Sequence, residues 1–277
     1  MTRQDDNELE EIEIELLIEG LYQRYGIDLR NYERDSLRRK IRDRMLQEQA
    51  MTVSGLQEKA LRAAECPDRL LLSLASNGGT MFGDPGFYTA FRAKVIPLLR
   101  TYPFVRIWLA GCSTGEEAYS MAIALEEEGL YQRSRIYATE ISREAVKQAK
   151  EGAFPLSEAS QYTSNYLRSG GRRYFSDYYR TCDGRIFFDP ALKKNVTFLE
   201  HNLATDGSIN EFQVILCRNV MPYFNPELQE RVHELIYESL VVFGVAGLGR
   251  HEPLRYSPRE AFYEALDEEN RIYRKVL

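Results

Sequence analysis

Short apolar runs that alternate with amphipathic stretches constrain the fold of most of this chain. The runs lie at residues 105–110, 136–140, 196–200, 212–217 and 240–248, and helical periodicity occupies roughly residues 115–128, 142–150 and 226–239. Strands separated by helices in this way need crossover connections, which give a mostly parallel sheet covered on both faces. We therefore predict a doubly wound α/β domain, to which residues 269–277 add an edge strand.

The N-terminal part of the chain shows helical periodicity alone. Within residues 8–63, apolar residues recur at helical spacing in two segments, at Leu9, Ile12 and Leu16 and again at Leu37, Ile41 and Met45. No proline interrupts these segments, because the first one in the chain is Pro67. We predict a helical N-terminal domain over residues 1–75 and the α/β domain over residues 76–277.

The alternation of strand and helix breaks down between residues 152 and 195. This segment is rich in tyrosine, contains a Gly-Gly pair at 170–171, and has an Asp-Gly pair at Asp183 and Gly184 between strand-forming residues. Asp-Gly in such a setting is typical of a two-residue hairpin turn. The sequence therefore predicts a small inserted β-subdomain near residues 155–195.

Composition and charge argue against several classes of protein. Cys66, Cys112, Cys182 and Cys217 form no Cys-x-x-Cys pair and have no histidine at ligand spacing, which argues against a metal site and a disulfide framework. No apolar run approaches the ~18 residues of a membrane span, and the first residues are acidic where a signal peptide is basic. The net charge of -6 gives no reason to expect nucleic acid as a partner. We expect a cytoplasmic monomer.

The first predicted strand runs into a turn of small residues between Gly111 and Gly115, and a helix follows. Such a turn lets a ligand approach the backbone at the carboxyl end of a strand. The motifs GxGxxG and GK[ST] are absent, and Glu116 and Glu117 would repel a pyrophosphate. These glutamates suit a ligand with hydroxyl groups or positive charge. The alternative is a tight turn that binds nothing.

The second predicted strand ends at Glu140, where an acidic side chain can accept hydrogen bonds from both hydroxyls of a ribose. The alternative is an acid near the start of the helix at residues 142–150. Taken together, Glu140 and the Gly111 turn favour an adenosine-type ligand without phosphates, which indicates S-adenosylmethionine.

The third and fourth predicted strands add polar residues to the same edge of the sheet. Asn202 follows the third strand, Arg218 and Asn219 end the fourth, and Tyr223 comes four residues later. An arginine at the end of a buried strand needs a partner, so a structural ion pair is the alternative for Arg218. His201 is expected to be a packing residue rather than a catalytic base.

Five stretches of the chain resemble, in order and spacing, the motifs of the chemotaxis receptor methyltransferase family (CheR). They read AGCSTGEEAYSMAI, IYATEIS, HNLATD, CRNVMPYF and LGRHEPLRYS, and the resemblance covers residues 10–277. It implies an S-adenosylmethionine-dependent protein-glutamate O-methyltransferase that yields S-adenosylhomocysteine. It also implies a helical N-terminal domain, a doubly wound catalytic domain and a small β-subdomain. The implied substrates are chemoreceptor helices rich in glutamate.

The resemblance also implies roles for individual residues. It places the methyl donor in contact with Asn77, Glu116, Glu140, Asn202, Leu203, Arg218 and Asn219. Tyr223 would lie beside the transferred methyl group. The family usually has aspartate where this chain has Glu140, and one extra methylene should shift the ribose contact without abolishing it.

Two glycines depart from the family pattern. The family stretch resembles N-x-T-x-x-F-R-D-P, but Gly79 stands at the threonine position and Gly83 at the arginine position. A shifted register would place Thr80 near the missing hydroxyl, and a positive φ is an alternative reason for Gly83. An active methyltransferase remains one hypothesis. The other is a degenerate relative that binds S-adenosylmethionine or S-adenosylhomocysteine as a sensor or scaffold.

A basic helix is predicted within the N-terminal domain. Arg34, Arg38 and Arg42 recur at intervals of four residues, so they share one helix face. We expect this face to attract a glutamate-rich receptor helix, because the rest of the protein is acidic. The alternative is a solvated face paired with nearby acids, namely Glu33, Asp35 and Asp43.

Overall fold

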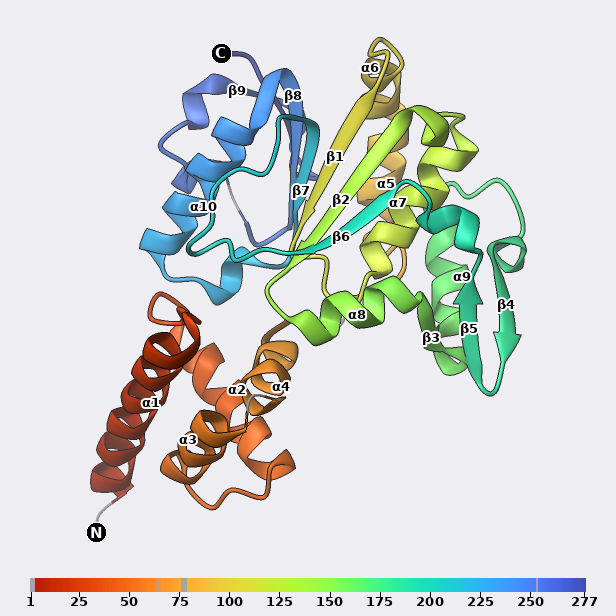
Figure 1. Ribbon diagram of the computed structural model, residues 1–277. Helices are drawn as coiled ribbons and strands as arrows, with labels where there is room; N and C mark the ends of the chain where they lie inside the picture. Colours follow the sequence, from red (N-terminus) through yellow and green to blue (C-terminus); the bar gives the residue numbers. More distant parts are fainter. Residues whose placement is uncertain (1–2, 64, 76–78, 253) are drawn as a thin grey trace.

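The computed structural model describes residues 3–63, 65–75, 79–252 and 254–277. These residues fold into three parts (Figure 1). Helices α1–α4 gather at the lower left, an α/β body lies above them, and a small sheet with its own helix lies on the right. Of the described helices, none is both long and apolar enough to cross a membrane.

The α/β body is built on a seven-stranded sheet with the order β6-β2-β1-β7-β8-β10-β9. Its strands are β1 (Val105–Ala110), β2 (Ser134–Glu140), β6 (Val196–Glu200), β7 (Phe212–Cys217), β8 (Leu240–Leu248), β9 (Tyr263–Asp267) and β10 (Ile272–Lys275). The first five strands of that order are parallel, and β10 is antiparallel to both of its neighbours. The predicted doubly wound, mostly parallel sheet is thus confirmed.

The predicted C-terminal strand exists as β10, but the expectation that it forms an edge is wrong. It lies between β8 and β9, and β9 is the edge strand. The physical reason is a β9–β10 hairpin, which inserts its second strand against β8. Ile272 and Tyr273 are consequently both buried, one on each face of the sheet.

Alternate side chains of the central strand enter two different cores. Ile107 and Leu109 of β1 pack against α5 (Pro85–Ala90), the π-helical segment Phe91–Val95, α6 (Ile96–Leu99) and α7 (Glu116–Glu127). Trp108 and Ala110 belong to the core that contains α10 (Pro226–Ser239) and the N-terminal helices. This alternation is the period of two that a strand buried on both faces requires. Helix α8 (Arg143–Glu151) packs beside β2 and β6.

The N-terminal part consists of α1 (Arg3–Tyr25), α2 (Arg34–Gln47), α3 (Val53–Arg62) and α4 (Glu65–Ala75). The predicted periodicity does form helices, but the apolar residues Leu9, Ile12 and Leu16 of α1 are exposed. The buried face of α1 carries Ile14, Leu17, Ile18 and Leu21 instead, and it packs against α3. Helix α1 has apolar residues on two sides, so periodicity alone does not identify the side that packs.

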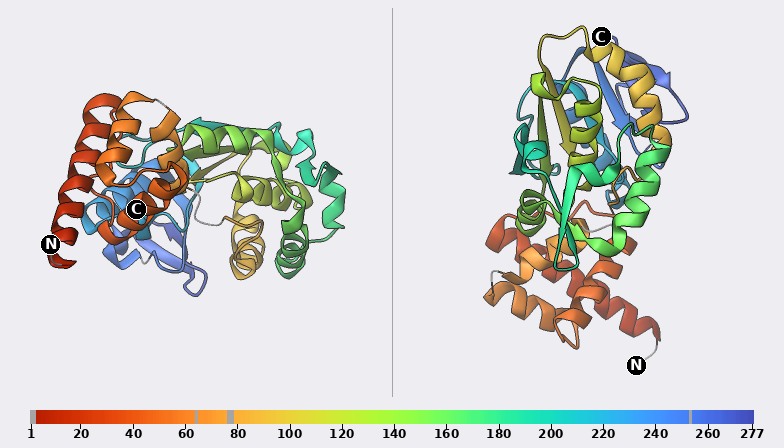
Figure 2. Two further views of the ribbon diagram at one scale, coloured as in Figure 1. Left: turned by 90° about the horizontal axis from the view of Figure 1, so that it is seen from below. Right: turned by 90° about the vertical axis from the view of Figure 1, so that its right-hand side faces the viewer.

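The helical part is joined to the α/β body just beyond β7. Tyr32 forms an isolated antiparallel bridge with Phe224, and their rings meet edge to face at 5.1 Å. The Glu33 N–H donates to the Tyr223 carbonyl at 2.8 Å, and the Asn225 N–H donates to the carbonyl of residue 31 at 2.9 Å. The right-hand view of Figure 2 shows α1–α4 below the α/β body, at one end of its sheet. Helix α2 therefore starts beside the residues that follow β7.

The inserted segment contains β3 (Ala153–Pro155), α9 (Ala159–Arg168), β4 (Tyr179–Cys182) and β5 (Arg185–Phe188). The predicted hairpin is present, with Asp183 at φ 48° and Gly184 at φ 70° between β4 and β5. Helix α9 was not expected. Tyr162 and Tyr166 are both buried and lie four residues apart, so they share one face of a helix. This spacing is the signal for a helix in a stretch whose tyrosine content is typical of strands.

Candidate active site

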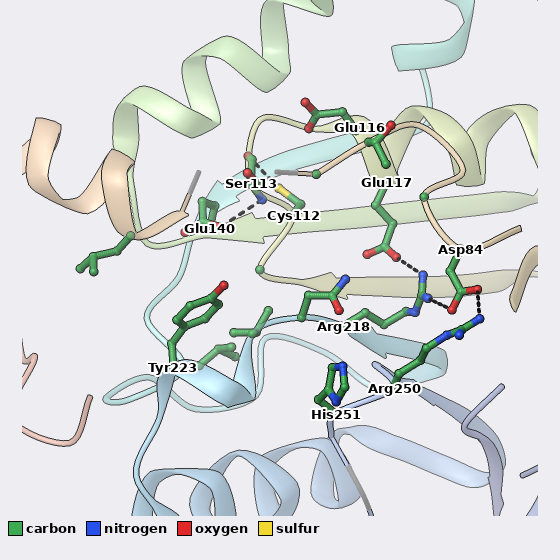
Figure 3. Close-up of a pocket in the computed structure, with 18 of the residues that line it drawn as sticks. Asp84, Cys112, Ser113, Glu116, Glu117, Glu140, Arg218, Tyr223, Arg250 and His251 are labelled. Atoms are coloured by element: carbon green, nitrogen blue, oxygen red, sulfur yellow. Dashed lines mark hydrogen bonds and ion pairs between the residues drawn. The ribbon is translucent and has the colours of Figure 1, made fainter. Parts of the chain in front are cut away.

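A pocket of about 780 Å³ lies at the carboxyl ends of β1, β2 and β7 (Figure 3). The strand order reverses between β1 and β7, and ligands of doubly wound sheets bind at such a point. The described residues predicted to bind the methyl donor or to act in catalysis all line this pocket: Glu116, Glu140, Asn202, Leu203, Arg218, Asn219 and Tyr223. Asn77 lies outside the described residues. The fold thus brings together side chains from four different strand ends.

The turn after β1 needs two of its glycines for backbone and packing reasons. Gly111 has a φ of +83°, and a Cβ there would lie 2.4 Å from a methyl group of Val220. Gly115 has a φ of +102°, and a Cβ there would lie 2.8 Å from the Cβ of Ala149. Any side chain at either position would be strained and would collide. The bare backbone of Gly111 consequently lies against the pocket.

Glu140 is buried at the end of β2. One carboxylate oxygen accepts from the Ser113 N–H at 3.0 Å, and the other accepts from the Ile141 N–H at 2.7 Å. Burial raises the pKa of Glu140, and these backbone donors oppose the rise. Each carboxylate oxygen has more than one acceptor position, so two hydroxyl donors of a ligand can still be accommodated.

Glu116 is the buried acid at the start of α7. The Thr114 hydroxyl donates to its carboxylate, with oxygen–oxygen distances of 2.8 and 2.9 Å. Burial raises the pKa of Glu116 to about 6. A Cβ on Gly79 would lie 3.2 Å from this carboxylate, so the missing threonine hydroxyl would have faced Glu116. Thr80 lines the same pocket and its hydroxyl lies 3.5 Å from the side-chain amide nitrogen of Asn165 in α9, whereas Thr114 contacts Glu116.

Arg218 is held by two carboxylates. Its Nη1 lies 3.1 Å from Glu117, its Nη2 lies 2.9 Å from Asp84, and its guanidinium stacks 4.0 Å above the ring of Phe87. The second Asp84 oxygen pairs with Arg250 at 3.2 Å (Figure 3). The structural ion pair considered for Arg218 therefore exists. The Nε of Arg218 is buried and has no hydrogen-bond partner among the described residues.

Tyr223 ends a 3-10 turn that begins at Met221. Glu252 fixes this turn by accepting from the Val220 N–H at 2.6 Å and from the Met221 N–H at 2.9 Å. Burial raises the pKa of Tyr223, although the nearby positive charge of Arg39 opposes the rise. The phenol therefore keeps its proton at neutral pH and can donate a hydrogen bond.

The structure also brings residues into the pocket that the sequence did not single out. Tyr32 and Leu74 come from the helical part, and Asp84, Arg250 and His251 come from the α/β part. Asp84 carried a signal, since it belongs to the stretch that matches the family pattern. Arg250 and His251 lie in the stretch LGRHEPLRYS, which resembles a family motif, although no role was assigned to them. Tyr32 and Leu74 carried no signal, because their proximity to the pocket depends on packing between distant segments.

The arginines of α2 lie elsewhere, against helix α1. Arg34 pairs with Glu15 at 3.7 Å, Arg38 pairs with Glu10 at 3.7 Å and also with Glu11, and Arg42 pairs with Glu10, its Nε lying 2.6 Å from the carboxylate. The alternative that paired them with Glu33, Asp35 and Asp43 is wrong in its partners. Glu33 instead caps α2 by accepting from the backbone N–H groups of residues 35 and 36.

The pocket suits a nucleoside ligand with positive charge. Glu140 has acceptor positions for ribose hydroxyls, and the buried Glu116 has an unneutralised carboxylate. Among the described residues, no group of three His, Cys, Asp or Glu side chains is arranged to hold a metal ion. A pocket of this chemistry at the switch point of a doubly wound sheet defines a nucleoside-binding α/β domain.

Comparison with known families identifies the domain further. A family model described as "CheR methyltransferase, SAM binding domain" matches residues 78–268, and one described as "CheR methyltransferase, all-alpha domain" matches residues 12–74. The chain belongs to the CheR methyltransferase family. Its ligand is therefore S-adenosylmethionine.

Three relatives show how much of the chain is shared. The "Putative methyltransferase Cher3" of Pseudomonas putida is 44% identical over 265 residues, which cover 96% of this chain and 97% of the relative. The "Chemotaxis protein methyltransferase" of Listeria monocytogenes is 27% identical and covers 83% of this chain and 85% of its own. The "Chemotaxis protein methyltransferase Cher2" of Pseudomonas putida is 29% identical, and the match covers 76% of this chain and 74% of that relative.

Proposed function

We propose that the protein transfers a methyl group from S-adenosylmethionine to glutamate side chains of a chemoreceptor. The observation that carries this proposal is the gathering of Glu116, Glu140, Arg218 and Tyr223 around one pocket. The names of the two chemotaxis relatives support a chemotaxis substrate. The residues assigned to the cofactor and to catalysis are part of the same proposal.

Methyl transfer to glutamate requires little proton transfer by the protein. The acceptor carboxylate is already ionised at neutral pH, so no general base is required. S-adenosylmethionine supplies a methyl group activated by a positively charged sulfur. Glu140 would hold the ribose hydroxyls and Glu116 the positively charged part of the molecule. The protonated Tyr223 would orient the acceptor by donating to its carboxylate, and the pocket walls would exclude water.

Helix α2 is the proposed docking element for an acidic receptor helix. Arg34, Arg38 and Arg42 contribute to its positive potential, but each is already paired with a carboxylate of α1. Arg39 is exposed, has no ion pair within the described part of the chain, and is close enough to influence the pKa of Tyr223. An acidic helix drawn to Arg39 would therefore arrive beside the pocket.

A second function is favoured by Gly79 and Gly83. These positions lack the two polar side chains that the family pattern places there. A protein that binds S-adenosylmethionine or S-adenosylhomocysteine without efficient transfer would act as a sensor or scaffold. Retention of Tyr223, which has no evident use in a pure nucleoside sensor, favours the enzyme.

Two measurements test the proposal in sequence. Titration calorimetry with both nucleosides should show binding, and Glu140→Ala should weaken it at least about tenfold, since a carboxylate that accepts two hydrogen bonds is lost. Transfer of a radiolabelled methyl group to receptor fragments then separates the two functions. Binding without transfer would leave only the sensor, and no binding of either nucleoside at millimolar concentration would exclude both.

The docking surface has its own test. Arg39→Glu should weaken association with the receptor fragment while leaving nucleoside affinity unchanged, and the wild-type affinity should fall as salt rises. Association that is insensitive both to salt and to Arg39→Glu would rule out the proposed surface.

A further inference from the structure

The pocket is rich in carboxylates, although the proposed acceptor is itself a carboxylate. The acids that line it are Asp84, Glu116, Glu117, Glu140 and Glu158. An anionic side chain that enters such a site is repelled unless a cation is available to it. Among the described residues that line the pocket, the arginines are Arg168, Arg218 and Arg250.

Arg218 is not available to the acceptor as a free charge. Its side chain is only 7% exposed, and its two terminal amino groups pair with Glu117 at 3.1 Å and Asp84 at 2.9 Å. Pulling either carboxylate away would leave a buried charge without its partner, which is costly. Arg218 therefore serves to hold Asp84 and Glu117 in place.

Arg250, in contrast to Arg218, is available to the acceptor. Its side chain is 70% exposed, and it pairs with the Asp84 oxygen that Arg218 does not contact (Figure 3). One Nη2 contact to Asp84, at 3.2 Å, is the hydrogen bond that the structure gives its guanidinium. A guanidinium has five N–H donors, so most of them remain for a second carboxylate.

The backbone that carries Arg250 is fixed relative to Tyr223. Glu252, two residues further on, accepts from the Gly249 N–H in the same loop. It also accepts from the Val220 and Met221 N–H groups at 2.6 and 2.9 Å, in the turn that ends at Tyr223. One buried carboxylate thus ties the two segments together. The Arg250 side chain is therefore exposed at its guanidinium, while its backbone is anchored.

Gly83 lies next to Asp84, the residue that Arg250 contacts. It lines the pocket and has no side chain of its own. We propose that Arg250 binds the acceptor carboxylate and takes the place of the cationic side chain that Gly83 lacks. This inference rests on the proposed function, since it assigns the residue that recognises the acceptor.

The charge change of the reaction sets the kinetic signature. Methylation converts an anionic carboxylate into a neutral ester, so the acceptor is attracted to Arg250 most strongly before it reacts. A contact that is strongest in the ground state lowers KM and does not raise kcat. Loss of Arg250 should therefore raise KM for the receptor fragment about tenfold and change kcat by less than about threefold, the size expected for one charge-assisted hydrogen bond.

The test compares Arg250→Ala with a matched variant, Arg143→Ala. Arg143 is 71% exposed and pairs with a single carboxylate, that of Glu200 at 2.8 Å, outside the pocket. Arg250→Ala should raise KM for the receptor fragment while S-adenosylhomocysteine affinity and Tm stay at wild-type values. Arg250→Lys should recover part of the loss because it restores the charge. Arg143→Ala should leave KM, kcat, S-adenosylhomocysteine affinity and Tm unchanged.

The outcomes separate this inference from the proposed function. A wild-type protein that methylates no receptor fragment overturns the proposed function and this inference with it. Wild-type transfer with an unchanged KM in Arg250→Ala overturns the inference alone. A fall in S-adenosylhomocysteine affinity as large as the rise in KM would assign Arg250 to the nucleoside, and a rise in KM confined to Arg168→Ala would assign the contact to α9. Both results contradict the inference.

Discussion

At the scale of single residues, the pocket keeps acids in surroundings that disfavour their charge. Burial raises the pKa of Glu116 to about 6, and it also raises the pKa values of Glu117 and Glu140. Folding alone gains nothing from such placements, and perturbed acids in a cleft are characteristic of functional sites. We infer that these carboxylates are kept for the ligand at a cost in stability.

The pH dependence of stability should show this cost. Between its ordinary pKa of 4.5 and about 6, Glu116 binds its proton more tightly in the folded protein than in the unfolded chain. The contribution of Glu116 to the free energy of unfolding therefore falls as pH rises through this interval, by about 2 kcal/mol at 1.36 kcal/mol per pKa unit. Glu116→Gln should lose this part of the slope and be the more stable protein at pH 7.5. Urea unfolding at pH 5 and 7.5 gives the change in the free energy of unfolding with pH for the wild type and for Glu116→Gln. An equal change in the two proteins would contradict the raised pKa of Glu116.

Gly83 gives a second prediction at this scale. Its φ is not positive, so the positive-φ explanation is wrong, and the left-handed residue of this turn is Phe82 at φ 52°. A Cβ on Gly83 would lie 2.7 Å from the methyl group of Thr80. Gly83→Ala should therefore destabilise the protein by about 1 kcal/mol through overpacking, and Thr80→Ser should remove most of that effect. Additive losses in a double-mutant cycle of Gly83→Ala and Thr80→Ser would refute this reason.

Motif order on the sequence was enough to bring Glu116, Glu140 and Arg218 to one pocket. It was not enough for Arg250, because the contact with Asp84 joins positions 166 residues apart. Nor did it show that Thr114, rather than Thr80, faces Glu116. Which hydroxyl reaches a buried carboxylate is decided by the path of the turn, and single-sequence patterns do not specify that path.

At the scale of elements, helices α1 and α2 are joined by ion pairs that constrain how the basic face can be tested. Arg38 is 24% exposed and pairs with Glu10 and Glu11, whereas Arg39 is exposed and has no ion pair within the described part of the chain. Arg42 holds the pKa of Glu10 below its ordinary value through a hydrogen bond, despite partial burial. Charge reversal on the paired arginines would therefore confound binding with folding.

Arg38→Glu should lower the free energy of unfolding by about 1 kcal/mol or more, because it sets a third carboxylate against Glu10 and Glu11. Arg39→Glu should change it by less than about 0.5 kcal/mol, as exposed substitutions usually do. Urea denaturation at low and high salt measures both, and the Arg38→Glu loss should shrink in high salt. Equal stabilities of the two variants would show that the α1–α2 pairs contribute nothing.

Strands and amphipathic helices of the α/β body were predictable, because burial on both faces gives continuous apolar runs and one-sided burial gives a helical period. Helix α9 was missed because tyrosine is a strand former by propensity, and here the tertiary contacts of Tyr162 and Tyr166 decide otherwise. The packed side of α1 was not predictable either. Its choice depends on α3, which periodicity within α1 does not describe.

At the scale of the whole molecule, the helical part and the α/β body share one core and one pocket. Apolar residues of α1–α4 belong to the same cluster as Trp108 of β1 and Phe224 beyond β7. Tyr32 and Leu74 reach the pocket from the helical side. A nucleoside bound there would therefore contact both parts, and we propose that the division near residue 75 separates two parts that depend on each other.

Calorimetry of the full chain should consequently show one unfolding transition. Three contacts couple the two parts: the Tyr32–Phe224 ring contact, the hydrogen bonds around Tyr223, and the packing of α4 on α8. Loss of one part would therefore expose apolar surface of the other.

S-adenosylhomocysteine at about 100 times its Kd adds about 2.7 kcal/mol to the free energy of unfolding and should raise the single Tm by about 5 °C or more. Tyr32→Ala should lower Tm and split the transition, because it removes the ring that bridges to Phe224. If the wild type already shows two transitions and the nucleoside moves only one of them, the helical part folds independently and the shared core does not couple it to the site.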